Sequence, residues 1–131
     1  PVTDRKFDNA SYSENAKGYS LEQETMRWYW NHYLASDADS ANPYAAPEQA
    51  GSLTGQPPAL VITAEFDPLR DEGEAYGKRL QEAGVETTIS RYDGMIHGFF
   101  ATVGSVDKST QVMAESTAAL KVAFGRANAA N

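Results

Sequence analysis

Two predicted strands, the first of them a short apolar run, occupy the middle of the chain, and a polar turn follows each. Residues 59–64 follow two prolines and are largely apolar, which is typical of a buried parallel strand. A second strand is predicted over residues 87–92. Between them, apolar and small residues recur at spacings of three and four and predict a helix with one face made of Leu69, Gly73, Tyr76, Leu80 and Ala83. Gly84 is the expected left-handed stop. The order strand, helix, strand predicts an α/β fold with parallel strands flanked by helices.

A further helix is predicted from Ser20, a suitable N-cap residue, to about Leu34. Apolar and aromatic groups cover much of its circumference, with Met26, Tyr29, Trp30, Tyr33 and Leu34 on one broad face and Leu21, Thr25, Trp28 and His32 in a neighbouring stripe. Such a helix must be covered on more than one side. We therefore expect a core helix between the sheet and a lid, with substrate contact as the alternative. For His32 we expect a structural role through a local hydrogen bond.

The outer segments of the chain are less regular. Residues 1–19 show neither helical nor strand periodicity, and residues 35–55 are rich in turn-forming residues and are predicted to be loop. A last helix is predicted over residues 109–124. It should pack flat on the sheet through Val112, Ser116, Ala119, Leu120 and Ala123.

Asp67 directly follows the first predicted strand. Catalytic side chains gather at the carboxyl ends of strands in open α/β sheets, so Asp67 is a candidate catalytic acid. The alternative is an N-cap, because Pro68 suits the first helical position. Asp71 and Glu72 fall in the first helical turns, where carboxylates favour the helix dipole. We interpret them as structural, with Asp71 and Glu74 as a capping box.

His97 follows the second predicted strand and lies in a turn-rich loop before Gly98. A histidine that acts as general base must move between nucleophile and leaving group, and it needs a carboxylate that selects its tautomer. Asp67 stands at the end of the neighbouring strand and can supply that carboxylate. The order strand, acid, strand, histidine therefore favours a catalytic role for both residues over a helix cap and a solvated loop side chain.

Several segments resemble bacterial esterases related to hormone-sensitive lipase. The resemblance is carried by Leu60–Gly73, Tyr76–Gly84 and Tyr92–Phe100, and Pro1–Asp4, Tyr19–Leu34 and Pro57–Ala59 fit the same pattern. It implies an α/β-hydrolase fold, cleavage of carboxylic esters, and a catalytic triad in which Asp67 orients His97. In that family the histidine activates a serine in a Gly-x-Ser-x-Gly elbow, and a His-Gly-Gly-Gly loop contributes oxyanion donors.

Neither the elbow nor the oxyanion loop is present in the sequence. Residues 51–55 have the glycine spacing of the elbow but carry Leu53 at its centre. Because the triad order in this fold is Ser, Asp, His, the absent parts would precede Pro1. We therefore expect residues 1–131 to be the C-terminal portion of a single α/β-hydrolase domain, with residues 1–55 including a cap-proximal helix and loops. Two strands are too few for a stable doubly wound sheet, so we expect the chain alone to be unfolded or aggregated.

Composition narrows the function classes. The net charge is −7 and the 11 Lys and Arg residues form no basic run, which excludes nucleic acid as a partner. No apolar run approaches the ~18 residues of a membrane span. The chain contains no cysteine, and His32 and His97 do not stand at a metal-ligand spacing, so we expect no metal and no cofactor. We expect a cytoplasmic protein.

The resemblance thus predicts a carboxylesterase for short-to-medium acyl esters that is active only together with an N-terminal half bearing the serine. That half and a small ester are the expected partners, and a homodimer stays open. Two alternatives remain. One is a hydrolase of the same fold with a different nucleophile, for example an aspartate. The other is a non-catalytic fragment or binding module.

Overall fold

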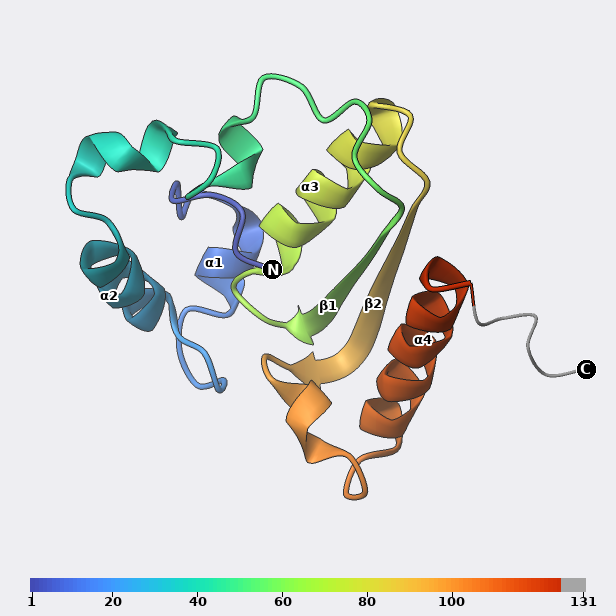
Figure 1. Cartoon of the computed structure of the whole chain (residues 1–131). Helices are drawn as coiled ribbons and strands as arrows, with labels where there is room; N and C mark the ends of the chain where they lie inside the picture. The colour runs from blue at the N-terminus through green and yellow to red at the C-terminus, as the bar shows by residue number, and fades with distance from the viewer. Residues whose placement is uncertain (126–131) are drawn as a thin grey trace, which may run out of the picture. The chain divides into compact units, whose positions relative to one another are not determined.

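The computed structural model describes residues 1–125 and falls into two units, Pro1–His97 and the segment from Gly98 onward. In chain order (Figure 1), the first unit contains α1 (Ala10–Glu14), α2 (Gln23–Tyr33), 3-10 turns at Asp37–Ala41 and Pro47–Gln49, β1 (Ala59–Phe66), α3 (Arg70–Glu82) and β2 (Thr87–Ile96). The second unit contains a 3-10 turn (Phe99–Thr102) and α4 (Asp107–Ala123). Among the described residues, no helix has both the length and the apolar composition that crossing a membrane requires.

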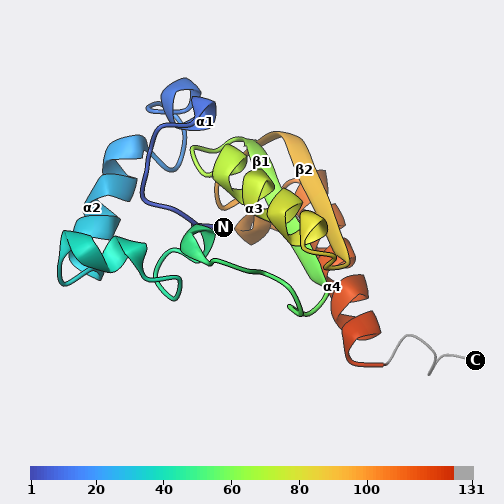
Figure 2. The ribbon, with the colours of Figure 1, turned by 90° about the horizontal axis from the view of Figure 1, so that it is seen from above.

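The two strands form a parallel pair, and α3 connects them along one face (Figures 1 and 2). Parallel strands need such a crossover because both run in the same direction. The predicted α/β fold, with parallel strands flanked by helices, is confirmed. β1 reaches Phe66 and β2 reaches Ile96, beyond the predicted ends at Ala64 and Tyr92. The predicted strands are too short because pairing resumes after an irregularity that the apolar pattern does not reveal.

The irregularity is a change of register near the carboxyl ends of the strands. Partners in the first part of the ladder are 28 residues apart in sequence, whereas Phe66 and its partner Ile96 are 30 apart. β2 therefore accommodates two more residues than β1 in this interval, as a bulge does. When the shifted register is continued by one residue, Asp67 and His97 stand level with each other.

α3 lies close to the strands because two glycines face its neighbours. A Cβ atom at Gly77 would lie 2.8 Å from Cγ1 of Ile89 and 3.4 Å from Cγ2 of Val61. A Cβ atom at Gly73 would lie 2.8 Å from Cδ of Pro1. The same Cβ atom would also lie 3.2 Å from Cγ2 of Thr63. Gly73 belongs to the face predicted from the apolar repeat, whereas Gly77 is not part of that prediction. Both positions approach their neighbours at a distance that only glycine allows.

The end of α3 agrees with the sequence analysis and its start does not. Gly84 adopts a φ of 78° after the last turn, which confirms the predicted left-handed stop. At the start, Leu69 is the N-cap residue and makes no side-chain capping bond. The predicted capping box of Asp71 and Glu74 is wrong. Asp71 instead accepts the backbone N–H of Ser11 at 2.8 Å, and Glu74 forms an ion pair with an arginine of β2.

Residues 1–19 contain a helix, α1, that the sequence analysis did not predict. Asn9 caps it by accepting the N–H of Tyr12 at 3.1 Å, and Tyr12 is fully buried. The backbone N–H of Thr3 donates to the buried carboxylate of Glu72 at 2.7 Å. A helix of five residues is too short to show periodicity, and contacts with α3 stabilise it. Glu72 is structural as expected, but as an acceptor for the N-terminal segment.

α2 begins later than predicted. Its first residue is Gln23, preceded by Glu22, which makes no side-chain capping bond. The predicted N-cap at Ser20 is therefore wrong, and the helix is entered from an extended residue instead. Near the other end, Nδ1 of His32 lies 2.8 Å from the carbonyl oxygen of Trp28. This is the local hydrogen bond that was expected of His32.

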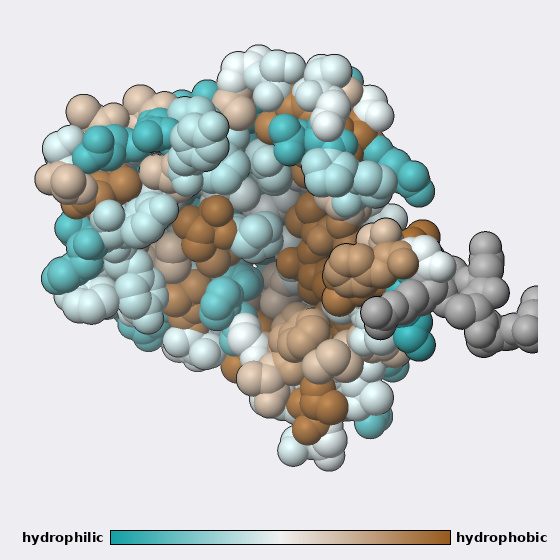
Figure 3. Space-filling view, in the orientation of Figure 1, coloured by the Kyte–Doolittle hydropathy of each residue, from teal (hydrophilic) through white to brown (hydrophobic). Residues whose placement is uncertain are grey.

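One side of α2 is buried and the other is open. Met26 and Trp30 belong to a core cluster completed by Tyr12, Leu21, Ala46 and Leu69. By contrast, Trp28, Tyr29 and Tyr33 are between 51% and 66% exposed. On the side where Figure 1 draws α2, the surface in Figure 3 mixes pale, teal and brown residues. For the residues that the structure describes, the prediction that this helix is covered on more than one side is wrong.

The second unit is organised around a buried hydroxyl group. Ser109 is fully buried and its Oγ donates to the carbonyl oxygen of Phe99 at 2.7 Å, which ties α4 to the 3-10 turn. α4 starts at Asp107 and ends at Ala123, close to the predicted bounds. Its packing on the sheet stays a prediction.

Replacing Gly77 with Ala tests the close approach of α3. The new methyl group would overlap Ile89, and overpacking of this kind costs about 1–3 kcal/mol. That cost exceeds the gain of about 0.4–1 kcal/mol that Gly→Ala brings where the structure tolerates it. We expect the full-length protein with this substitution to have a lower free energy of unfolding in urea. Gly51→Ala is the matched control, because no atom lies within 4 Å of the added Cβ. A Gly77→Ala protein as stable as the Gly51→Ala protein would contradict the packing argument.

Candidate functional site

Asp67 and His97 lie side by side at the carboxyl ends of the two strands. Nδ1 of His97 is 2.8 Å from Oδ2 of Asp67. Because a carboxylate can only accept hydrogen bonds, Nδ1 carries the proton, and Nε2 is the basic nitrogen of the neutral ring. The side chain of Asp67 is 10% exposed and that of His97 is 43% exposed. The acid is therefore sheltered, and the histidine is accessible to a further group.

The two carboxylate oxygens of Asp67 have different partners. Oδ1 accepts the backbone N–H of Leu69 at 2.9 Å, while Oδ2 contacts His97. Since α3 begins only at Arg70, the contact with Leu69 forms a turn ahead of the helix and is no N-cap. A local structural role and a role in the pair are therefore combined in one side chain. The turn holds one oxygen and so fixes the direction of the other.

α1 supports the loop that carries Asp67. The fully buried hydroxyl of Ser11 donates to the carbonyl oxygen of Pro68 at 2.7 Å and accepts the backbone N–H of Asp71 at 3.2 Å. Nδ2 of Asn15 lies 3.4 Å from the carbonyl oxygen of Asp67. Sequence reasoning missed Ser11 and Asn15. The one available signal was Asn9 as a cap residue, which marks the helix but not the loop that the helix contacts.

Two neighbouring carboxyl groups at the start of α3 have pKa values that are shifted in opposite directions. Burial opposes ionisation of Asp71, but hydrogen bonds from the Arg70 side chain and the Ser11 backbone lower the pKa of Asp71 overall. For Glu72, burial dominates and raises its pKa, although the N–H groups of the N-terminal segment partly oppose this. Asp71 is therefore a stable anion that anchors Arg70, whereas Glu72 resists ionisation.

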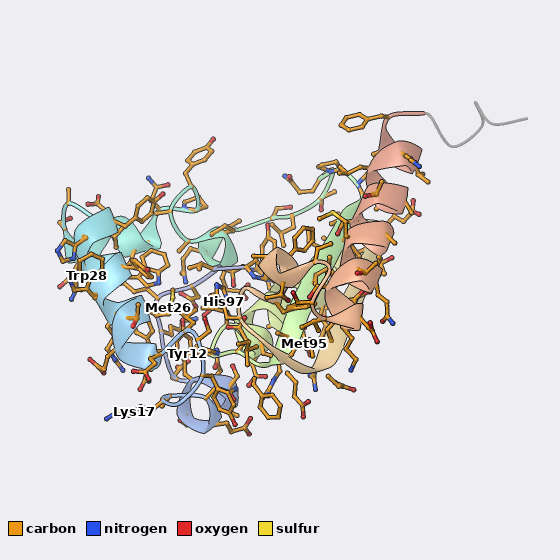
Figure 4. All side chains as sticks on the ribbon, turned by 90° about the horizontal axis from the view of Figure 1, so that it is seen from below. Tyr12, Lys17, Met26, Trp28, Met95 and His97 are labelled. Atoms are coloured by element: carbon orange, nitrogen blue, oxygen red, sulfur yellow. The ribbon has the colours of Figure 1, made fainter. Side chains whose placement is uncertain are left out.

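A cavity of about 510 Å³ opens beside His97. Apart from His97, its wall is apolar or aromatic, and α2 contributes Met26, Tyr29, Trp30 and Tyr33. Figure 4 shows His97 and Met26 in the same part of the first unit. Cavities of this size and character accept small organic ligands, with the few polar groups setting the orientation. α2 is thus part of the core on one side and a cavity wall on the other.

The nucleophile expected of a complete triad is not found in the part of the chain that the structure describes. Within residues 1–125, the ring of His97 is hydrogen-bonded to Asp67 and to no serine hydroxyl. In the segment with elbow-like glycine spacing, Leu53 is 5% exposed and packs with Leu80 and Val85. Leu53 therefore belongs to the core, whereas the other four residues of that segment are exposed.

Known proteins resemble this chain in sequence and in fold. A family model described as the alpha/beta hydrolase fold matches residues 1–101. The chain is 42% identical to an arylesterase of Saccharolobus solfataricus over 90% of this chain and 39% of the relative. It is 35% identical to an ethyl acetate hydrolase of Pseudomonas putida over 81% of this chain and 33% of the relative. The structure of an alpha/beta hydrolase enzyme from the metagenome of Lake Arreo, Spain, matches with a TM-score of 0.87 at 42% identity, over 95% of this chain and 39% of that protein. The chain therefore spans between 33% and 39% of the length of these relatives.

Ser11→Ala tests the support that α1 gives to the loop. The substitution leaves the buried carbonyl of Pro68 and the N–H of Asp71 without their partner, and each unmet buried group costs about 1–3 kcal/mol. For the two groups together we expect the full-length protein to lose about 2–6 kcal/mol of unfolding free energy. Thr63→Val is the control, because it removes a buried hydroxyl whose one bond within residues 1–125 is to the side chain of Glu74, at 3.0 Å. A loss no larger than that of the control would show that the loop does not depend on Ser11.

Proposed function

The chain belongs to the α/β-hydrolase fold family, in the branch of esterases related to hormone-sensitive lipase, and we propose that it supplies the acid and the histidine of a carboxylic ester hydrolase. The observation that carries the proposal is the hydrogen bond of 2.8 Å between Nδ1 of His97 and Oδ2 of Asp67. It leaves Nε2 basic and accessible, as a general base requires. A module that only binds a partner has no need of such a pair beside an apolar cavity.

In the proposed enzyme, the nucleophile is a serine on a segment outside residues 1–131. No Gly-x-Ser-x-Gly elbow occurs in the sequence, and the serine precedes the acid and the histidine in the chain order of this fold. The partner of this chain is accordingly an N-terminal half of the same enzyme that carries the elbow and the oxyanion donors. Mass spectrometry of the active protein identifies that half. The residue at the centre of its elbow then shows whether the nucleophile is a serine or an aspartate.

His97 acts as base and then as acid in this mechanism. Nε2 takes the proton of the serine hydroxyl while the serine oxygen attacks the ester carbonyl carbon, and Asp67 stabilises the imidazolium that forms. The tetrahedral intermediate then breaks its bond to the alcohol oxygen, which receives the proton from Nε2. Water attacks the resulting acyl-enzyme by the same two proton transfers and releases the carboxylic acid and the free serine.

The cavity beside His97 supports short-to-medium acyl esters as substrates. Its volume of about 510 Å³ accommodates a small ester, and its apolar wall favours alkyl or aryl groups over charged ones. Relatives named as an arylesterase and an ethyl acetate hydrolase are consistent with small ester substrates.

Removing the base tests the function directly. We expect His97→Ala in the full-length enzyme to lower ester turnover by about 10⁴-fold or more, as for triad members generally, with little change in melting temperature. His32→Ala is the matched control, since His32 contacts the carbonyl and the ring of Trp28 within its own helix and lies outside the cavity wall. Turnover is measured on a short-chain ester. His97→Ala with a tenth of the parental activity would overturn the assignment.

Asp67→Asn separates the turn contact of Asp67 from its effect on His97. The amide oxygen of Asn can still accept the N–H of Leu69, so the free energy of unfolding should change by less than about 1 kcal/mol. The amide carries no charge to stabilise the imidazolium and favours the wrong tautomer of His97, which in a serine triad costs about 10⁴-fold in kcat. Turnover and thermal unfolding are measured on one preparation. A variant with a normal melting temperature and near-parental turnover would show that Asp67 has only a structural role, in the turn that contacts Leu69.

A further inference from the structure

The register shift between the strands selects which residue of β2 faces Asp67. Ala64 pairs with Tyr92, an offset of 28 residues, and Phe66 pairs with Ile96, an offset of 30. With the first offset continued, Asp67 would stand level with Met95. With the second, it stands level with His97. Because side chains alternate with a period of two, a shift of two residues exchanges these positions without turning the strand over.

The bulge is held by one side chain of the opposite strand. Gly94 lies in the interval that carries the extra residues and has a φ of 76°, a conformation that glycine adopts readily. Its N–H donates to Oε2 of Glu65 at 2.5 Å. Glu65 is the β1 residue between Ala64 and Phe66, where the register changes. A carboxylate thus takes the place of the strand carbonyl that a regular ladder would offer to this N–H.

The backbone of Glu65 is itself fixed. Its carbonyl oxygen accepts a hydrogen bond from Nη1 of Arg70 at 3.0 Å, and Arg70 is anchored in turn by Asp71 at 2.8 Å. The carboxylate that reaches Gly94 therefore projects from a rigid position. Glu65 is not part of the wall of the cavity beside His97.

From these contacts we infer that Glu65 is a positioning residue for His97. Its carboxylate fixes the β2 bulge through the N–H of Gly94, and the bulge keeps the imidazole level with Asp67 (Figure 4 labels Met95 and His97 on this segment). The inference rests on the proposed ester hydrolase function and adds to it a residue that acts through the backbone. Its effect is on the alignment of the pair and leaves substrate binding unchanged.

The test measures kcat and KM of the full-length enzyme on a short-chain ester. Glu65→Ala should lower kcat by about 10- to 100-fold, the size expected when catalytic groups are displaced by about 1 Å, and leave KM near the parental value. Glu65→Gln keeps an oxygen that accepts the N–H of Gly94, so kcat should recover to near the parental value. Glu65→Asp keeps the charge but is too short to reach Gly94, so it should behave like Glu65→Ala. The Gln variant keeps the length of the side chain without its charge, and the Asp variant keeps the charge without the length. The pair of variants therefore shows which of the two properties positions the bulge.

Glu74→Ala is the matched control. Glu74 also bonds β2, through an ion pair of 2.6 Å with Arg91, but ahead of the bulge. We expect its kcat to stay near the parental value. A double-mutant cycle compares the effect of Glu65→Ala on kcat in the parental and the Asp67→Asn enzymes. A residue with a purely structural role would lower kcat by the same factor in both. In the Asp67→Asn background, Glu65→Ala should cost little further kcat, because the pair that it aligns is already broken.

Different results would refute the proposed ester hydrolase function and the positioning role of Glu65. An active His97→Ala enzyme would refute the proposed function itself. An inactive His97→Ala enzyme together with a parental kcat for Glu65→Ala would refute only the role of Glu65. Equal losses for Glu65→Ala in the parental and Asp67→Asn backgrounds would likewise refute it, and so would a Glu65→Gln enzyme as slow as Glu65→Ala.

Discussion

The parallel pairing of β1 with β2 is the constraint on which the candidate site depends. Parallel strands end at the same edge of a sheet, so two side chains 30 residues apart in sequence come within 2.8 Å of each other. The pairing requires a crossover, and α3 can lie close enough to serve as one because Gly73 and Gly77 present no side chain to their neighbours. The Asp67–His97 pair is therefore a product of the whole strand–helix–strand unit.

Buried polar contacts attach the N-terminal segment to this unit. Thr3 donates to Glu72, and Ser11 bonds the backbone on both sides of the turn after Asp67. The carboxyl groups involved respond to pH in opposite directions. The raised pKa of Glu72 adds stability at low pH that is lost as pH rises through the folded-state value. The lowered pKa of Asp71 adds stability at higher pH that is lost as pH falls through its own.

α2 shows how one helix can serve a core and a cavity together. Met26 and Trp30 pack in the core cluster and also line the cavity beside His97, while Tyr29 and Tyr33 line it and remain half exposed or more. Apolar and aromatic residues cover much of this helix because one part of its surface packs in the core and another part lines the cavity. A core alone needs a narrower stripe, and burial on all sides would leave no cavity.

The sequence by itself determined the order strand, helix, strand, the stop at Gly84, and Asp67 and His97 as the acid and base candidates. These rest on local periodicity, on glycine stereochemistry and on chain order, which are properties of neighbouring residues. Only the tertiary structure decided the bulge at Gly94, the contact of Ser11 with Pro68 and the bond from Thr3 to Glu72. Each of these joins residues between 29 and 69 positions apart, and whether such groups meet depends on packing energies that no local pattern encodes.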